Sequence, residues 1–190
     1  MIKQCFKNID FRILWGAGCM TGIARAMEFL ALSLFALQEL GLPYLVTIIF
    51  AARMLPMSLL GIVIGTISER VSPISVIKFI YTLSNISTGI AILLVFTDNF
   101  NVIFAFLLAF INGITWVVDL AVRRRVLADN INQNLLSSSL AMETLSNNAT
   151  RLIGPLCAGS LYAFVGLAGI FSVQFFMYIL ALGFIIKFQK

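Results

Sequence analysis

The stretch from residue 101 to residue 122, NVIFAFLLAFINGITWVVDLAV, is long and apolar enough to cross a membrane as a helix. A crossing takes roughly 20 mostly apolar residues. Barrel strands are about 10 residues long and alternate in polarity, so this pattern predicts a helix. Five other stretches share it, and we expect one all-α membrane domain over residues 1–190. The six predicted spans are 13–37, 43–67, 76–97, 101–122, 137–163 and 166–186.

The distribution of charge predicts the orientation of these spans. Hydrophobic residues make up 61% of the chain, charged residues 11%, and the net charge is +5. Basic residues occur at both termini and in every second connection, with a cluster at 123–125. Cytoplasmic connections are enriched in basic residues, so we expect both termini in the cytoplasm and a multi-pass protein of the cell (inner or plasma) membrane. The basic connection 123–136 separates two sets of three spans, an architecture that suggests a 3+3 inverted repeat.

Six charged side chains lie well inside the predicted spans, in addition to Lys78 near the cytoplasmic end of the third span. Each costs at least about 2.5 kcal/mol at mid-membrane on insertion scales, so each needs a partner or an aqueous cavity. They occur in the first, second, fourth and fifth spans, which predicts that these four helices face the interior and that the other two are peripheral. The six are Arg25, Glu28, Arg53, Asp119, Glu143 and Arg151.

Two interpretations of these charges remain open. In the structural one, ion pairs lock helices together, with Arg151 paired to Glu143 and Arg53 to a carboxylate on a neighbouring helix. In the functional one, some charges line a wet cavity. Arg25 and Glu28 share a helix face and can pair, so Glu28 is available to bind a proton only if Arg25 is drawn elsewhere. The candidates for substrate binding or coupling are Arg25, Glu28, Asn112 and Asp119.

The sequence gives no sign of catalysis or of a metal site. It contains no histidine, and its three cysteines have no paired spacing. No phosphate-binding loop or nucleophile motif is present. We therefore expect no metal, no cofactor and no enzymatic activity. Because membrane topology explains the positive charge, we also expect no nucleic acid partner.

Two segments resemble the major facilitator superfamily of transporters. The run GTISERVS at 65–72 resembles the signature Gly-x-x-x-Asp-Arg-x-Gly, with Glu69 in place of Asp, and Gly65 and Arg70 as matches. The run RLIGPLCAG at 151–159 is similar to the fifth-helix pattern Arg-x-x-Gly-Pro-x-x-Gly-Gly of drug and siderophore exporters in that superfamily. Its matching residues after the arginine are Gly154, Pro155 and Gly159.

The resemblance implies a fold and an activity. In that superfamily helices one and four line a central cavity, helices two and five flank it, and helices three and six lie outside. Members have twelve spans in two halves, and this chain resembles the amino-terminal half. The implied protein is a half-size secondary transporter that moves a small organic solute outward by alternating access. Its cytoplasmic gate would be formed by Gly65, Glu69 and Arg70.

A half-size transporter needs a second half. We expect a homodimer in the lipid bilayer, or a pairing with a separately encoded second half. The alternative function is that of a non-transporting assembly or regulatory subunit of the membrane, or a fragment of a full-length exporter.

Overall fold

The described part of the chain is built from helices. A computed structural model describes residues 5–67, 72–131 and 133–188, without the side chains of 39, 60–67 and 134. These ranges contain no strand, which confirms the all-α prediction. The helices are α2 (Ile9–Leu34), the π-helical segment η1 (Phe35–Glu39), α3 (Tyr44–Ile67), α4 (Pro73–Phe96), α5 (Val102–Asn130) and α6 (Gln133–Ile186).

Polar caps set the starts of three helices. The Asn8 side chain accepts a hydrogen bond from the backbone N–H of Asp10 at 2.8 Å, and Asn101 accepts one from Ile103 at 3.0 Å. Ser72 caps α4, whose first residue is Pro73. A proline at this position loses nothing, because the first N–H groups of a helix have no partner inside it. These local signals place α2, α4 and α5 where the apolar stretches begin.

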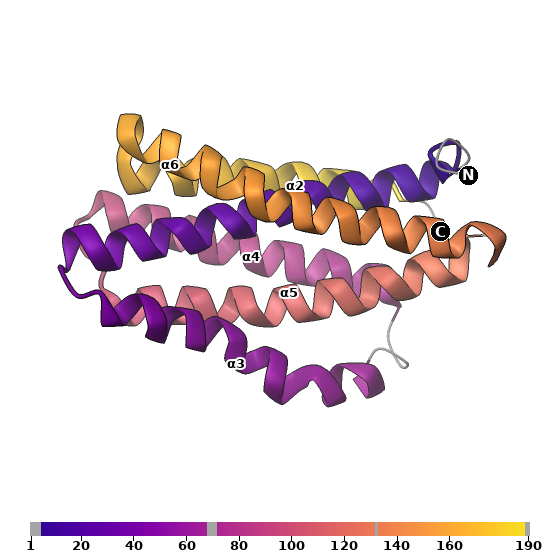
Figure 1. Ribbon diagram of the computed structural model, residues 1–190, viewed down its shortest axis with the longest axis horizontal. Helices are drawn as coiled ribbons and strands as arrows, with labels where there is room; N and C mark the ends of the chain where they lie inside the picture. Colours follow the sequence, from indigo (N-terminus) through magenta and orange to yellow (C-terminus); the bar gives the residue numbers. More distant parts are fainter. Residues whose placement is uncertain (1–4, 68–71, 132, 189–190) are drawn as a thin grey trace.

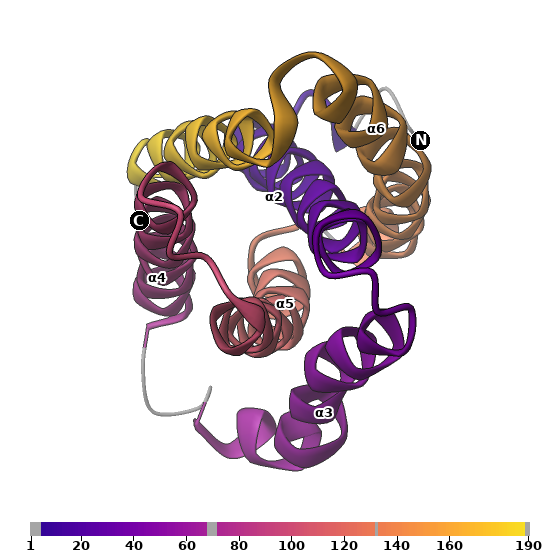
Figure 2. The same ribbon diagram turned by 90° about the vertical axis from the view of Figure 1, so that its left-hand side faces the viewer.

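Helix α6 consists of two segments joined at Gly166. This residue has φ 63° and ψ −162°, a conformation that is open to glycine and strongly disfavoured for other residues. The chain reverses there, and Figure 2 shows the second segment, in yellow, turning away from the first, in orange. The reversal places residues 133–165 and 167–186 as separate members of the bundle.

The helices form a bundle in which α5 lies among α2, α3 and α4 (Figures 1 and 2). Helix α2 packs mainly on α6, α3 packs on α5, and α4 packs on both α5 and α6. Both chain termini lie at the same end of the bundle (Figure 1). This arrangement leaves α3 at one edge of the bundle, packed on α5.

The apolar helices confirm that this is a membrane protein. Among the described residues, four helices are long and apolar enough to cross a bilayer, and α3 contributes a shorter apolar helix, Tyr44–Leu59. The four are Ile9–Gln38, Pro73–Phe96, Val102–Asn130 and Leu135–Ile186, the last containing the reversal at Gly166. The predicted number of six crossings and the inverted repeat stay predictions.

The prediction of a connection over residues 123–136 is wrong, because most of this stretch is helical. Helix α5 continues through the three arginines to Asn130, and only residues around 131–132 separate it from α6. The segment RRRVLADN contains no glycine or proline to stop a helix. Arg123, which the sequence interpretation placed in the connection 123–136, is therefore a buried residue of α5, 6% exposed.

The interior contains two apolar clusters with a polar layer between them. One cluster gathers around Phe35, Ile49 and Phe171, and the other around Phe11, Tyr81 and Ile185. On each helix that enters both clusters, the residues between them include buried polar ones. They are Thr21, Arg25, Ser84, Thr88, Asn112, Thr115, Asp119 and Gln174. This layer lies near the middle of the helices, and it includes two of the charges predicted from the sequence, Arg25 and Asp119.

Replacing Gly113 with alanine should loosen the contact between α3 and α5. An added Cβ would lie 2.2 Å from the Arg53 carbonyl oxygen and 3.1 Å from Pro56 Cγ. We expect Gly113→Ala to lower the stability of the purified protein by about 1–3 kcal/mol, measured as a fall in the thermal unfolding midpoint in detergent. Gly183→Ala is the matched control, because nothing lies within 4 Å of its added Cβ. An equal effect of both substitutions would contradict the close contact.

Candidate substrate pocket

Asp119 is the centre of the buried polar layer. Its Oδ2 accepts a hydrogen bond from Arg25 Nη1 at 2.8 Å, and its Oδ1 accepts one from the Tyr81 hydroxyl at 2.9 Å. Arg123, one turn further along α5, places Nε 3.2 Å from Oδ1. Asp119 is fully buried, so its charge is supported entirely by these neighbours. One carboxylate thus connects α2, α4 and α5.

Arg123 extends the network to α6. Its Nη2 lies 3.2 Å from Oε1 of Glu143, and both side chains are almost completely buried. The sequence interpretation paired Glu143 with Arg151 instead, and that pairing is wrong. Arg151 lies over the ring of Trp116, with 5.1 Å from its guanidinium carbon to the ring centroid. The structural ion pair on α6 therefore belongs to Arg123.

Glu28 has a different environment from Asp119. The predicted pairing of Arg25 with Glu28 is replaced, because Arg25 is drawn to Asp119. Glu28 accepts a hydrogen bond from Gln174 of the second α6 segment, and the side chain of Asn112 also hydrogen-bonds to it. The largest cationic influence on Glu28 is that of Arg53. The condition set for Glu28 to be available, that Arg25 is engaged elsewhere, is met; its role in coupling stays a prediction.

Arg53 has no ion pair with a carboxylate among the described residues. Its Nη1 donates a hydrogen bond to the backbone carbonyl oxygen of Arg25 at 3.1 Å. Its guanidinium also lies 5.5 Å from the ring centroids of both Phe29 and Trp116. Such cation–π contacts stabilise a cation that is partly withdrawn from water. The neighbouring carboxylate expected from the sequence is represented by Glu28, which acts on Arg53 electrostatically and without a direct ion pair.

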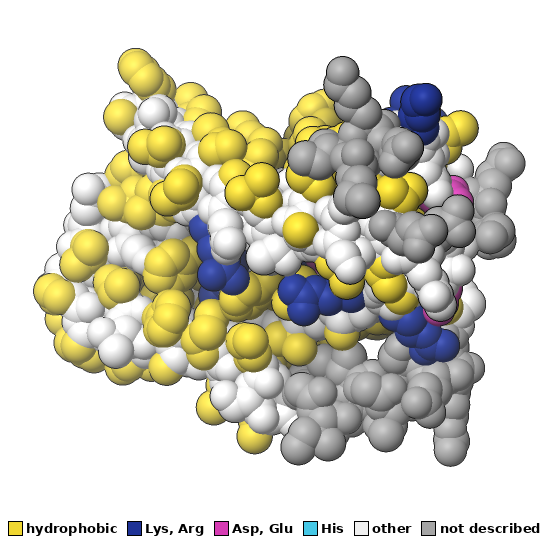
Figure 3. Space-filling model, turned by 45° about the vertical axis from the view of Figure 1, so that its right-hand side comes forward, with side chains coloured by type: hydrophobic (Ala, Val, Ile, Leu, Met, Phe, Trp, Pro, Cys, Tyr) yellow, Lys and Arg dark blue, Asp and Glu magenta, His cyan; other side chains and the backbone are white. Residues whose placement is uncertain are grey.

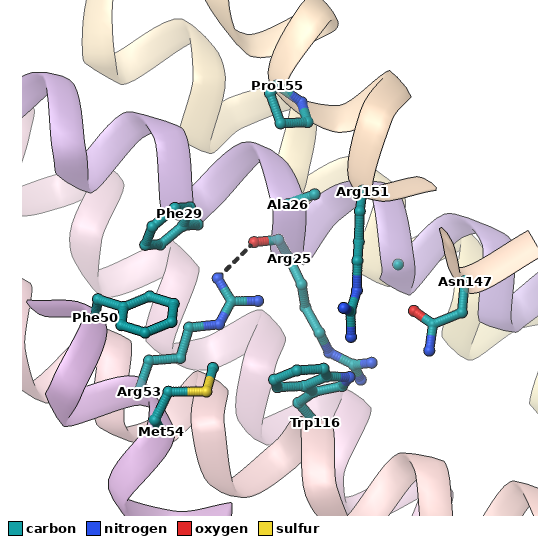
Figure 4. A pocket seen from close by; sticks show the side chains of 11 residues that line it. Arg25, Ala26, Phe29, Phe50, Arg53, Met54, Trp116, Asn147, Arg151 and Pro155 are labelled. Atoms are coloured by element: carbon teal, nitrogen blue, oxygen red, sulfur yellow. Dashed lines mark hydrogen bonds between the residues drawn. The ribbon is translucent and has the colours of Figure 1, made fainter. Parts of the chain in front are cut away.

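Three arginines, Arg25, Arg53 and Arg151, line a pocket of about 390 Å³. Figure 4 shows Arg25, Arg53 and Arg151 arriving from three different helices with their guanidinium groups near Trp116. Figure 3 shows basic side chains, in dark blue, set within a largely hydrophobic face. The pocket draws on α2, α3, α5 and the first segment of α6, the four helices in which the sequence places the buried charges. Its lining residues are Gly22, Arg25, Ala26, Phe29, Phe50, Arg53, Met54, Trp116, Asn147, Arg151 and Pro155.

The other predicted site residues fall around this pocket or outside the described part of the chain. Gly154 packs against Ala26, where an added Cβ would come within 2.4 Å of the alanine Cβ, and Gly159 faces Leu30. Gly65 belongs to α3. Glu69 and Arg70, the predicted gate residues, lie outside the described residues.

Several residues of the site were missed from the sequence. The Trp116 ring makes cation–π contacts with two of the pocket arginines. Gln174 donates a hydrogen bond to Glu28, and Tyr81 donates one to Asp119. The spacing of Asp119 and Arg123, four residues apart on one helix, was a signal that the arginine is part of the internal network. Gln174 and Tyr81 show that the two helices predicted to be peripheral also contribute polar groups to the interior.

Comparison with known families agrees with this architecture. The family described as transmembrane secretion effector, a group of MFS-type transporters, matches residues 4–190. The chain belongs to this family. MFS-type transporters are generally not enzymes, in accord with the expectation from sequence. No curated protein matches the chain, and no solved structure matches it.

Removing the Asp119 charge should destabilise the protein strongly. Asp119→Asn leaves Arg25 and Arg123 without their shared carboxylate in a buried site, where loss of one partner typically costs about 3–5 kcal/mol. Asp129→Asn is the control, because Asp129 is 60% exposed and only 3.8 Å from Arg125 on the same helix, a pair worth about 1 kcal/mol or less. The measurement is denaturant unfolding in detergent. Similar losses for both variants would show that Asp119 is not the centre of the network.

Proposed function

We propose that this chain forms one side of the substrate pathway of a secondary transporter, which moves a small organic solute outward across the cell membrane by alternating access. The observation that carries the proposal is the pocket, because it gathers three arginines and six aromatic or apolar side chains near the middle of four helices. Membership of a transporter family supports it. A concave, mostly apolar site with a few convergent polar groups is typical of small-molecule binding.

The pocket requires a second wall. Arg151 is exposed, and the α6 residues after it, Leu152 and Leu156, are each 72% exposed. Arginines facing hydrocarbon at this depth are costly, so we infer that a second six-helix unit covers this face. With two antiparallel segments in α6, the chain supplies six helical segments, and an even number of crossings agrees with termini at one end of the bundle. The simplest partner is a second copy related by a twofold axis along the membrane normal.

Alternating access then consists of rocking of the two units around the pocket. Within this chain, the ion pairs of Asp119 and Arg123 hold α2, α5 and α6 together, so that they move as one body. The predicted gate at Glu69 and Arg70 adjoins the end of α3 in the sequence and is proposed to close the cytoplasmic side.

Filling the pocket should stop transport. Met54 lines the pocket on α3, whereas Met57, on the same helix, is not part of the lining and is 48% exposed. We expect Met54→Trp to reduce solute release at least about tenfold, because the larger side chain occupies space needed for ligand contacts. Met57→Trp is expected to retain release. The assay loads proteoliposomes with a panel of small organic solutes and identifies those released by mass spectrometry.

Two results would contradict the proposal in this assay. One is release that is equal in the Met54→Trp and Met57→Trp variants, which would place the pathway elsewhere. The other is the absence of protein-dependent release for every solute, which would favour a non-transporting assembly or regulatory subunit.

The second unit should be visible as an oligomer. We expect the purified chain in lipid nanodiscs to have a protein mass twice that of one copy, 20.9 kDa, because a lone copy leaves the arginine pocket facing lipid. Native mass spectrometry gives the mass after removal of lipid. Copurification with a different six-helix protein would replace the homodimer by a heterodimer. A lone monomer at all protein-to-lipid ratios would contradict both assemblies.

A further inference from the structure

The pocket has a charge imbalance that bears on what it binds. Arg25, Arg53 and Arg151 contribute to its lining, and no carboxylate of the described residues does. Two carboxylates that act on these arginines, Asp119 and Glu28, are buried and are not part of the lining: Asp119 pairs with Arg25, and Glu28 accepts a hydrogen bond from Gln174. Asp119 in particular is shared between Arg25 and Arg123. Positive charge is therefore presented to the pocket without a matching negative charge on its surface.

Two of the guanidinium groups are close to the same aromatic ring. Arg53 lies 5.5 Å and Arg151 lies 5.1 Å from the centroid of the Trp116 ring. Both Arg25 and Arg151 repel Arg53 electrostatically. Like charges held together in a site of low dielectric are unfavourable, and an anion placed among them relieves the repulsion.

Arg25 supplies an independent indication of a missing partner. Its side chain is only 4% exposed, and one of its three nitrogens, Nη1, binds Asp119. The remaining two, Nε and Nη2, are buried and have no hydrogen-bond partner in the part of the chain that the structure describes. A buried donor without an acceptor costs about 1–3 kcal/mol, more when charged, so an acceptor in the pocket would be strongly favoured.

The opposite side of the pocket is aromatic. Phe29 and Phe50 meet edge to face with ring centroids 5.7 Å apart, and Met54 lies beside them on α3. Figure 4 shows these side chains on the far side of Arg53 from Arg151. Such a surface suits a flat apolar body, while the arginines suit an oxyanion, which a guanidinium binds through two parallel hydrogen bonds.

We propose that this pocket binds a small aromatic anion, with its oxyanion group among Arg25, Arg53 and Arg151 and its ring against Phe29 and Phe50. The proposal rests on the transport function above and specifies the class of its substrate. A pocket of about 390 Å³ lies at the small end of the range for ligand sites.

An anionic lipid has the same chemistry at its headgroup, and the depth of the pocket argues against it. Arg25, Trp116 and Arg151 lie near the middle of their helices, between the two apolar clusters. The hydrocarbon core is about 30 Å thick, so a lipid phosphate would have to leave the interface and enter the core. A solute that reaches the pocket through a transport pathway has no such constraint.

The experiment uses Trp116 as a reporter. The chain has two tryptophans, so Trp15→Phe leaves Trp116 as the single fluorophore. Three nitroaromatic quenchers of nearly equal shape are titrated into this protein in uncharged detergent: para-nitrobenzoate, para-nitrobenzyl alcohol and para-nitrobenzylammonium. We expect the anion to bind at least about tenfold more tightly than the alcohol, and the cation to bind more weakly than both. Equal affinities, or tightest binding of the cation, would overturn the proposal.

Charge variants test the residues. Arg151 is exposed and has no structural ion pair among the described residues, so Arg151→Gln should fold normally. We expect it to raise the Kd of para-nitrobenzoate about tenfold or more while the Kd of the alcohol stays unchanged. Arg151→Lys should recover part of the loss, because charge returns without the planar fork. Arg12→Gln, at the exposed start of α2, is the matched control. An effect as large for Arg12→Gln would overturn the assignment.

Lipids with brominated acyl chains distinguish a lipid occupant from a solute. Bromine quenches nearby tryptophan, so phosphatidylglycerol and phosphatidylcholine are compared in brominated form. We expect equal quenching by both and no reversal by benzoate, an aromatic anion that lacks the quenching nitro group. Stronger quenching by phosphatidylglycerol that benzoate reverses would assign the site to lipid and overturn the solute. Binding of the anion without any solute release would contradict the transport function alone, and release without anion preference would contradict this inference alone.

Discussion

A single buried carboxylate, Asp119, holds the interior of this protein together. It is fully buried and lies between two arginines, one on α2 and one on its own helix, with Tyr81 as a third donor. Each of these charges would be very costly alone in a site of low dielectric. Together with Glu143 they form a chain of alternating sign that runs from the pocket at Arg25 to the first segment of α6. The relative positions of the helices that form the pocket depend on this chain.

The order of apolar and polar layers along the helix axes explains the position of the pocket. Apolar clusters lie on either side of the polar layer. The layer between them supplies buried hydrogen-bonding groups, and the pocket lined by Arg25 lies at this level. The close approach of α5 to the Arg53 carbonyl at Gly113 brings α3 near enough to add Arg53 to the pocket. This packing places Arg53, which Asp119 does not neutralise, beside Arg25, which Asp119 does neutralise.

The sequence predicted which helices form the site better than it predicted which charged side chains pair with one another. Hydrophobic length alone predicted the apolar helices, and charges within them identified four helices that the structure gathers around one pocket. The pairings depend on the rotation of each helix about its axis, which spacing along one chain does not determine. For that reason Arg25 was paired with Glu28 on its own helix, although the structure joins it to Asp119 across the bundle. Trp116 and Gln174 were missed because uncharged side chains in apolar stretches are ordinarily packing residues.

The separation of Arg25 and Asp119 along the chain has a consequence for biogenesis. The two residues are 94 positions apart, and synthesis proceeds at about 5–20 residues per second. The first helix therefore emerges with its arginine roughly 5–20 s before the carboxylate that will bind it exists. During that interval the carboxylate at hand is Glu28, three residues along on the same helix face. The pair that is absent from the finished structure is thus the one available to the nascent helix, and completion of the bundle exchanges it for Asp119 on one side and Gln174 on the other.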